Sequence, residues 1–150
     1  MGEDLAMANR PTRSPVLLQV RAGELVETGA WLYAWLTVPA ADVLYVGCTR
    51  LPPQVRTWLH LHDPDPDVGR VAARHPAVLS SPVDVLAFPL SDGLDRQAVK
   101  SALIAALHEA GLLSMGYVGN PPNTPDAEEA VKEHVASMVI NIAAHRPCSG

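Results

Sequence analysis

Arg56 and His60 are the residues whose types and spacing point most directly to chemistry. They lie four positions apart in the segment 52–62 (PPQVRTWLHLH), where two prolines can open a helix, so both side chains are expected to project from one helix face. An arginine can grip a phosphate through two N–H groups and stabilise negative charge as it builds in a displacement. A nearby histidine or tyrosine with a suitable pKa can accept a proton from attacking water. These residue types therefore suit phosphodiester chemistry.

Two tyrosines lie in neighbouring segments that predict β-strands. Tyr33 belongs to residues 30–38 (AWLYAWLTV) and Tyr45 to residues 43–48 (VLYVGC), and both segments are rich in aromatic and β-branched residues. Only the four residues 39–42 separate them. Two apolar runs around so short a break predict an antiparallel hairpin.

The register of this hairpin decides whether the tyrosines can share a site. If Val38 pairs with Val43, the numbers of paired residues sum to 81, and Tyr33 and Tyr45 fall on opposite faces of the sheet. A site that uses both tyrosines requires an even sum, such as 80, through a three- or five-residue loop or a bulge. In that register we expect both hydroxyls to approach Arg56.

Taken together, these segments resemble the GIY-YIG nuclease superfamily. The two triplets of that family are read here as WLY at 31–33 and YVG at 45–47, with tryptophan and leucine in the places of the first glycine and isoleucine. In that family the two tyrosines lie on a β-hairpin, and an arginine and often a histidine follow on the first helix, where this chain has Arg56 and His60. The resemblance covers about residues 30–110 and includes a later strand and helix.

The resemblance implies metal-dependent cleavage of one strand of DNA or RNA. It implies that Tyr33 activates the attacking water or acts as a base, that Tyr45 positions a phosphate or water, and that Arg56 clamps the phosphate. His60 is a further candidate catalytic residue. Family members often place an asparagine after the catalytic helix, so the resemblance adds Asn120 or Asn123 of the loop 114–124 as a candidate. The candidates for substrate binding are Gly47, Thr49, Lys100 and Asn120.

The acid that would hold the metal is missing from its expected position. In the family it is a glutamate ahead of a Leu-Ile pair, but residues 99–104 read VKSALI, with Lys100 in that place. A lysine repels Mg²⁺ or Mn²⁺, which prefer oxygen ligands. A second register, LHEAGLL at 107–113, supplies Glu109 at the end of the predicted helix. We favour the register with Lys100 and expect impaired or lost cleavage, with Mg²⁺ or Mn²⁺ as cofactor only if the protein is active.

The charge leaves the kind of partner open. A net charge of −5 argues against a strongly basic nucleic-acid binder but allows a local basic patch. We expect Arg56 and Lys100 on the side of the sheet that carries Tyr33. A scattered placement of the basic residues would favour a protein-interaction module, with a homodimer or another protein as partner. Binding of DNA or RNA would require one side of the domain to gather Arg50, Arg56, Arg70, Arg74 and Lys100.

Length and composition predict one domain of the α+β class. The chain has 150 residues, of which 48% are hydrophobic and 18% charged, enough to bury a core. A third strand is predicted at 82–90, which gives a small, mainly antiparallel sheet of three or more strands flanked by helices. We expect residues 1–14 to be a disordered leader and 15–150 to form the domain, with an extra C-terminal helix at about 125–145. The sequence shows neither a membrane span nor a secretory signal, so we expect a cytoplasmic protein.

Overall fold

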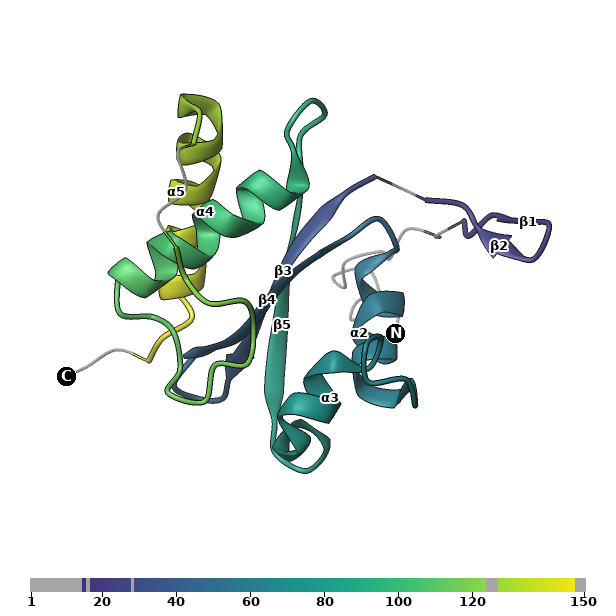
Figure 1. Cartoon of the computed structure of the whole chain (residues 1–150), viewed down its shortest axis with the longest axis horizontal. Coiled ribbons are helices and arrows are strands. Elements are labelled where there is room, and N and C mark those ends of the chain that lie inside the picture. Colours follow the sequence, from purple (N-terminus) through teal and green to yellow (C-terminus); the bar gives the residue numbers. More distant parts are fainter. Residues whose placement is uncertain (1–14, 16, 28, 124–126, 148–150) are drawn as a thin grey trace, which may run out of the picture.

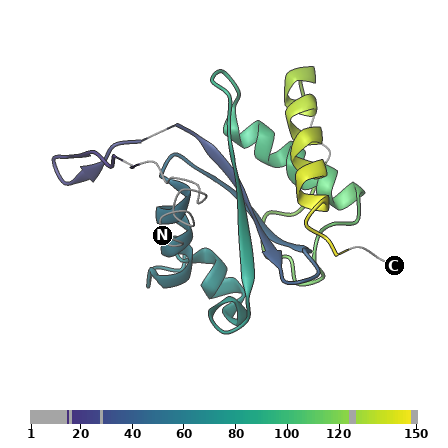
Figure 2. The same cartoon turned by 180° about the vertical axis from the view of Figure 1, so that it is seen from behind.

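The computed structural model describes residue 15 and residues 17–27, 29–123 and 127–147. The fold is α+β, with a three-stranded antiparallel sheet that has helices on both faces (Figure 1). The view from behind shows the sheet again between two groups of helices (Figure 2). One face is covered by α2 (Pro53–His62) and α3 (Arg70–Arg74), and the other by α4 (Arg96–Glu109) and α5 (Glu129–Ala143).

The sheet is built from the three predicted strand segments. Strand β3 (Trp31–Thr37) is central, with β4 (Val43–Thr49) on one side and β5 (Val83–Pro89) on the other, both antiparallel to it. A second, two-stranded sheet is formed by β1 (Val20–Arg21) and β2 (Glu24–Leu25). This small hairpin, which we call the arm, projects from the body of the domain (Figure 1).

A bulge in β4 sets the register of the central hairpin. Tyr33 pairs with Gly47 and Trp35 pairs with Tyr45, so the paired numbers sum to 80 over this stretch, and the register then shifts between Trp35 and Leu36. Side chains two residues apart on one strand share a face, as do directly paired residues. Tyr33 and Tyr45 therefore lie on the same face, which is the even register that a shared site requires, and a bulge produces it.

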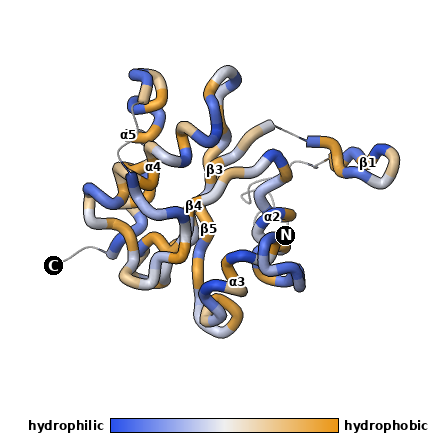
Figure 3. Tube along the Cα trace, viewed as in Figure 1, coloured by the Kyte–Doolittle hydropathy of each residue, from blue (hydrophilic) through white to orange (hydrophobic). Residues whose placement is uncertain are grey.

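The two faces of the sheet carry two separate cores. Leu32, Ala34 and Val46 point toward α4 and α5, whereas Tyr33 and Tyr45 belong to a smaller core with Val71 of α3. Figure 3 shows hydrophobic stretches along the strands and on the helices that pack against them. The sheet thus separates a fully apolar core from one that contains polar aromatic groups, and the candidate residues belong to the second.

The helices follow the sequence pattern with one difference at the C-terminal end. Asp95 caps α4 by accepting hydrogen bonds from the backbone N–H groups of Gln97 and Ala98. The last helix begins at Glu129, later than the predicted 125, and residues 124–126 lie outside the described residues, as does the predicted leader 1–14. A short 3₁₀ helix, η1 (Pro76–Leu79), precedes β5. No helix among the described residues is long and apolar enough to cross a membrane.

The packing of α5 predicts how two isoleucines of that helix differ. Ile142 is completely buried against the core shared with α4, whereas Ile140 is 71% exposed. Ile142→Ala should lower the free energy of unfolding by about 3 kcal/mol, because it leaves a cavity, and Ile140→Ala should change it by less than about 0.5 kcal/mol. Urea denaturation of both variants measures this difference. Equal losses at the two positions would show that α5 does not pack as described.

Candidate functional site

A cluster of three aromatic residues forms the centre of the candidate site. The side chains of Tyr33, Tyr45 and His60 come from β3, β4 and α2, and their ring centroids lie 5.2 to 6.2 Å apart. The Tyr33 hydroxyl lies 2.6 Å from Nε2 of His60 and forms a buried hydrogen bond with it. Both tyrosines are only 3% exposed, and His60 is completely buried. Three of the four predicted catalytic residues therefore meet.

Gly47 makes room for the ring of Tyr33. A Cβ atom at position 47 would lie 2.5 Å from Cζ of Tyr33 and even closer to its hydroxyl. Gly47 is the cross-strand partner of Tyr33, so the ring leans over the neighbouring strand toward His60. The glycine of the YVG triplet is thus explained by a close approach between two strands and need not contact substrate.

Burial keeps the Tyr33–His60 pair neutral near pH 7. Burial raises the pKa of Tyr33 well above its usual range, and neighbouring Tyr45 adds to this, while Arg56 acts in the opposite direction. Burial lowers the pKa of His60 to about 3, and the positive charges of Arg56, Arg70 and Arg74 contribute. Among the described residues, Nδ1 of His60 has no hydrogen-bond partner. A neutral, hydrogen-bonded pair holds its hydroxyl in a fixed position, but it is a weak acceptor of further protons.

A polar pocket of about 300 Å³ opens beside this cluster, at the edge of β4. Because β4 is an edge strand, helices from both faces of the sheet reach the pocket at this edge. Tyr33, Tyr45, Gly47 and Thr49 contribute to its wall. The cationic residues that line it come from four segments and are Arg50, Arg56, Arg70, Arg96 and Lys100. We call this hollow the cationic pocket.

The five cations differ in how strongly they are held. Arg56 donates from Nη1 to the carbonyl oxygen of Val68 at 3.0 Å, and Arg70 donates from Nε to that of Asp67 at 2.6 Å. The hydroxyl of Tyr45 lies beside the Arg70 guanidinium and raises the Arg70 pKa. Within the described part of the chain, the side chains of Arg96 and Lys100 form no hydrogen bond or ion pair, so their donors are available to a ligand. Arg50 pairs at 3.3 Å with Glu27 next to the arm.

The predicted position of Lys100 needs a correction. Arg56 lies in α2, on the tyrosine face as expected, but Lys100 lies in α4, which covers the opposite face of the sheet. Lys100 nevertheless lines the cationic pocket, because β4 is the edge strand and residues of α4 reach the pocket at this edge. A shared pocket therefore does not require a shared face.

Two other predicted residues lie away from the cationic pocket. Glu109 is at the C-terminal end of α4 and lines a separate hollow with Lys132 of α5. Asn120 does not line the pocket, and its backbone oxygen accepts a hydrogen bond from the Tyr117 hydroxyl at 2.7 Å. Thr49 does line it, although its hydroxyl oxygen accepts a local hydrogen bond from the backbone N–H of Leu51.

The sequence predicted most of the basic residues that line the cationic pocket, but not all of them. The pocket includes Arg50, Arg56 and Arg70, whereas Arg74 points elsewhere and donates to the carbonyl oxygen of Val118 at 3.1 Å. Arg96 was not among the predicted residues. Its signal was its position four residues before Lys100, which places both side chains on one face of α4.

The groups around the cationic pocket do not fit a divalent cation. Glu27 is the one carboxylate among the described residues that line it, and Glu27 is paired with Arg50. Nor do the described residues contain any group of three or more His, Cys, Asp or Glu side chains placed to hold a metal ion. Mg²⁺ and Mn²⁺ prefer carboxylate and other oxygen ligands, and five cations would repel them. The pocket is instead suited to an anion.

Comparisons with known proteins add no relative. The chain matches no protein-family model, no curated protein and no solved structure. The chemical assignment of this site therefore depends on its own geometry and on the motif resemblance.

The low pKa of His60 predicts a pH dependence of stability. Below about pH 6.5 the unfolded chain binds a proton at this histidine, whereas the folded protein does not until about pH 3. The free energy of unfolding should therefore fall as the pH falls through this window, by up to about 1.4 kcal/mol per pH unit from this group. His60→Gln should remove that contribution, and His108→Gln, at an exposed position of α4, serves as control.

Urea denaturation between pH 7 and pH 4.5 measures the slope for each protein. A shallower slope in His60→Gln than in the wild type and His108→Gln is expected. Parallel slopes for all three would mean that His60 is protonated as readily in the folded state as in the unfolded state.

Proposed function

We propose that this protein is a nuclease-related domain, similar to GIY-YIG proteins, that binds the phosphodiester backbone of DNA or RNA in the cationic pocket and has impaired or lost cleavage. The observation that carries this proposal is the convergence of five cationic side chains on one pocket in a chain of net charge −5. Such a local excess attracts a polyanion despite the overall acidity, because the Debye length is only about 8 Å at physiological salt.

The types of donor favour phosphate as the bound group. Four of the five cations are arginines, whose planar guanidinium groups can donate two N–H groups to one phosphate. Arg96 and Lys100, one helical turn apart on α4, have no protein partner among the described residues. The hydroxyl of Tyr45 lies beside Arg70 and can orient that guanidinium toward the ligand.

The same pocket argues for weak catalysis. A divalent ion stabilises the charge of attacking and leaving oxygens in metal-assisted hydrolysis, by several kcal/mol. Lys100 occupies the position where the resemblance expects the metal-binding acid, and it lines the pocket with a positive charge. The neutral Tyr33–His60 pair lacks a strong proton acceptor. We therefore expect the pocket to bind nucleic acid without cleaving it efficiently.

Salt dependence tests whether the pocket binds nucleic acid. Arg96→Gln should weaken binding of a labelled single-stranded oligonucleotide about tenfold at low salt and reduce the slope of log K against log [salt] by about one. Arg21→Gln removes the same charge from the exposed arm, where the arginine donates a hydrogen bond to the carbonyl oxygen of Val20, and should have little effect. Fluorescence anisotropy at several salt concentrations provides both quantities.

The absence of binding at low salt, or binding that ignores salt, would contradict nucleic-acid recognition. A protein-interaction module would then be the better account of the pocket.

Plasmid nicking tests the catalytic part of the proposal. The wild type should nick little or not at all with Mg²⁺ or Mn²⁺, and Lys100→Glu should gain trace activity, because it puts a carboxylate on the pocket wall. Glu109→Gln is the control at the other end of α4 and should leave nicking unchanged. Strong wild-type cleavage that Glu109→Gln abolishes would make Glu109 the metal ligand and refute the assignment of Lys100.

A further inference from the structure

A second hollow lies on the other side of α2 from the cationic pocket and is almost entirely apolar. This groove has a volume of about 770 Å³. Its walls come from the segment before the arm, the first residue of β3, one side of α2 and the middle of β5. They include Leu17, Leu18, Trp31, Trp58, Leu61 and Val85. Apart from Gln54 and Thr57, its lining is apolar. Exposing this much apolar surface to water is unfavourable, and exposed apolar grooves commonly mark binding sites.

Trp58 lines this groove and is exposed to solvent. Its side chain is 59% exposed, which is unusual for the largest apolar residue type. Its aromatic neighbour within the described part of the chain is the His62 ring, whose centroid lies 4.9 Å away on the next helical turn. A broad exposed indole suits stacking of a flat ligand.

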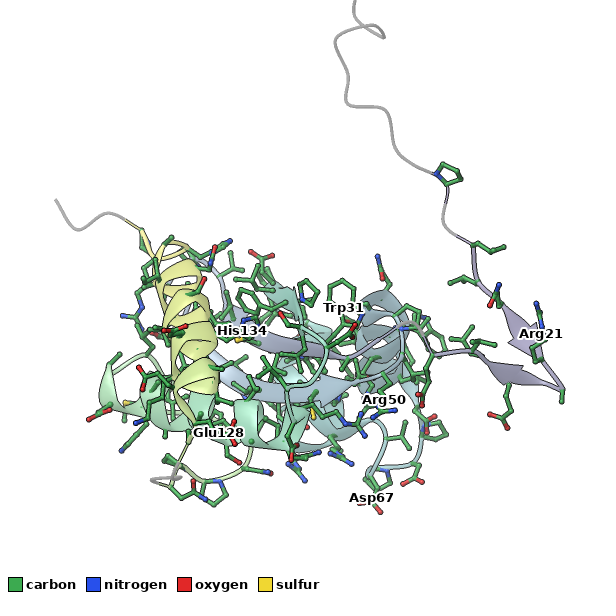
Figure 4. The ribbon with its side chains drawn as sticks, turned by 90° about the horizontal axis from the view of Figure 1, so that it is seen from above. Arg21, Trp31, Arg50, Asp67, Glu128 and His134 are labelled. Carbon is green, nitrogen blue, oxygen red and sulfur yellow. The ribbon has the colours of Figure 1, made fainter. Side chains whose placement is uncertain are left out.

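The groove and the cationic pocket share one short stretch of chain. Arg50 and Arg56 line the pocket, whereas Pro52, Pro53 and Thr57 line the groove. On β3, Trp31 lines the groove and Tyr33 lines the pocket, two residues or about 7 Å apart along the strand. Figure 4 shows Trp31 and Arg50 toward the end of the domain from which the arm projects. The two hollows are thus close enough for one extended ligand to reach both.

We propose that the groove is a stacking site for an unpaired nucleobase, so that the preferred ligand is a single strand. This inference rests on the proposed function, because the phosphate held in the cationic pocket brings the neighbouring base to Trp58. The charge is complementary to such a ligand: cations lie at the backbone end and an uncharged aromatic surface lies at the base end. Bases in a duplex are stacked on each other and cannot offer a free face, whereas those of a single strand can.

An abasic oligonucleotide separates the two hollows. It keeps the phosphates for the cationic pocket but offers no base to Trp58. The wild-type full-length protein should bind an intact labelled single strand of about ten nucleotides about tenfold more tightly than its abasic counterpart. Trp58→Ala should abolish this preference and leave the affinity for the abasic strand unchanged, and Trp58→Phe should retain part of it.

Leu79→Ala is the matched control, since Leu79 in η1 is also 59% exposed but does not line the groove. If Trp58→Ala keeps the full preference for the intact strand, the base-stacking site is refuted while phosphate binding stands. If the wild type binds neither strand, the proposed function itself fails. If Trp58→Ala instead changes the sedimentation of the free protein and not the preference, the groove is a contact between two copies and the inference is overturned.

Discussion

The bulge at Leu44 is the constraint on which the candidate site depends. Because Leu44 has no partner in β3, the register shifts, and Tyr45 comes to the face that already carries Tyr33. Without the shift, Tyr45 would point into the apolar core beneath α4, where its hydroxyl would lack a partner. The bulge thus allows one sheet to bury a fully apolar core on one face and a hydrogen-bonded aromatic cluster on the other. Gly47 then lets the Tyr33 ring lean across to His60.

The edge position of β4 determines the electrostatics of the site. With no strand beyond β4, side chains from α2 and α3 on one face and from α4 on the other meet at this edge. Five cations gather there, and the carboxylate of Glu27 is already paired with Arg50. This surplus of positive charge favours a phosphate and disfavours a divalent cation, so the geometry that supports binding also works against metal-assisted hydrolysis.

The sequence predicts the strands and most of the site because these depend on local patterns. Aromatic and β-branched runs locate β3 and β4, and helical spacing places Arg56 and His60 together. The choice between an odd and an even register could not be made, since a bulge depends on which side chains the whole core can bury. The chain after α2 turns back and brings Arg70 beside Tyr45, and this contact depends on tertiary packing that no local pattern predicts. Arg96 was not predicted, although the sequence shows that it lies one helical turn before Lys100. The face of the sheet on which Lys100 lies depends on the order of the strands, which the sequence does not show.

The most direct test of the account is an NMR titration of the ¹⁵N-labelled protein with a short single-stranded oligonucleotide. If phosphate binds in the cationic pocket, the backbone amide signals of Gly47, Cys48 and Thr49 at the end of β4 should shift progressively, together with those of Arg96 and its neighbours at the start of α4. The signals around Ile142 in α5 should stay in place. Shifts concentrated on α5, or no shift at the end of β4 at saturating oligonucleotide, would contradict the central claim that this edge of the sheet is the binding site.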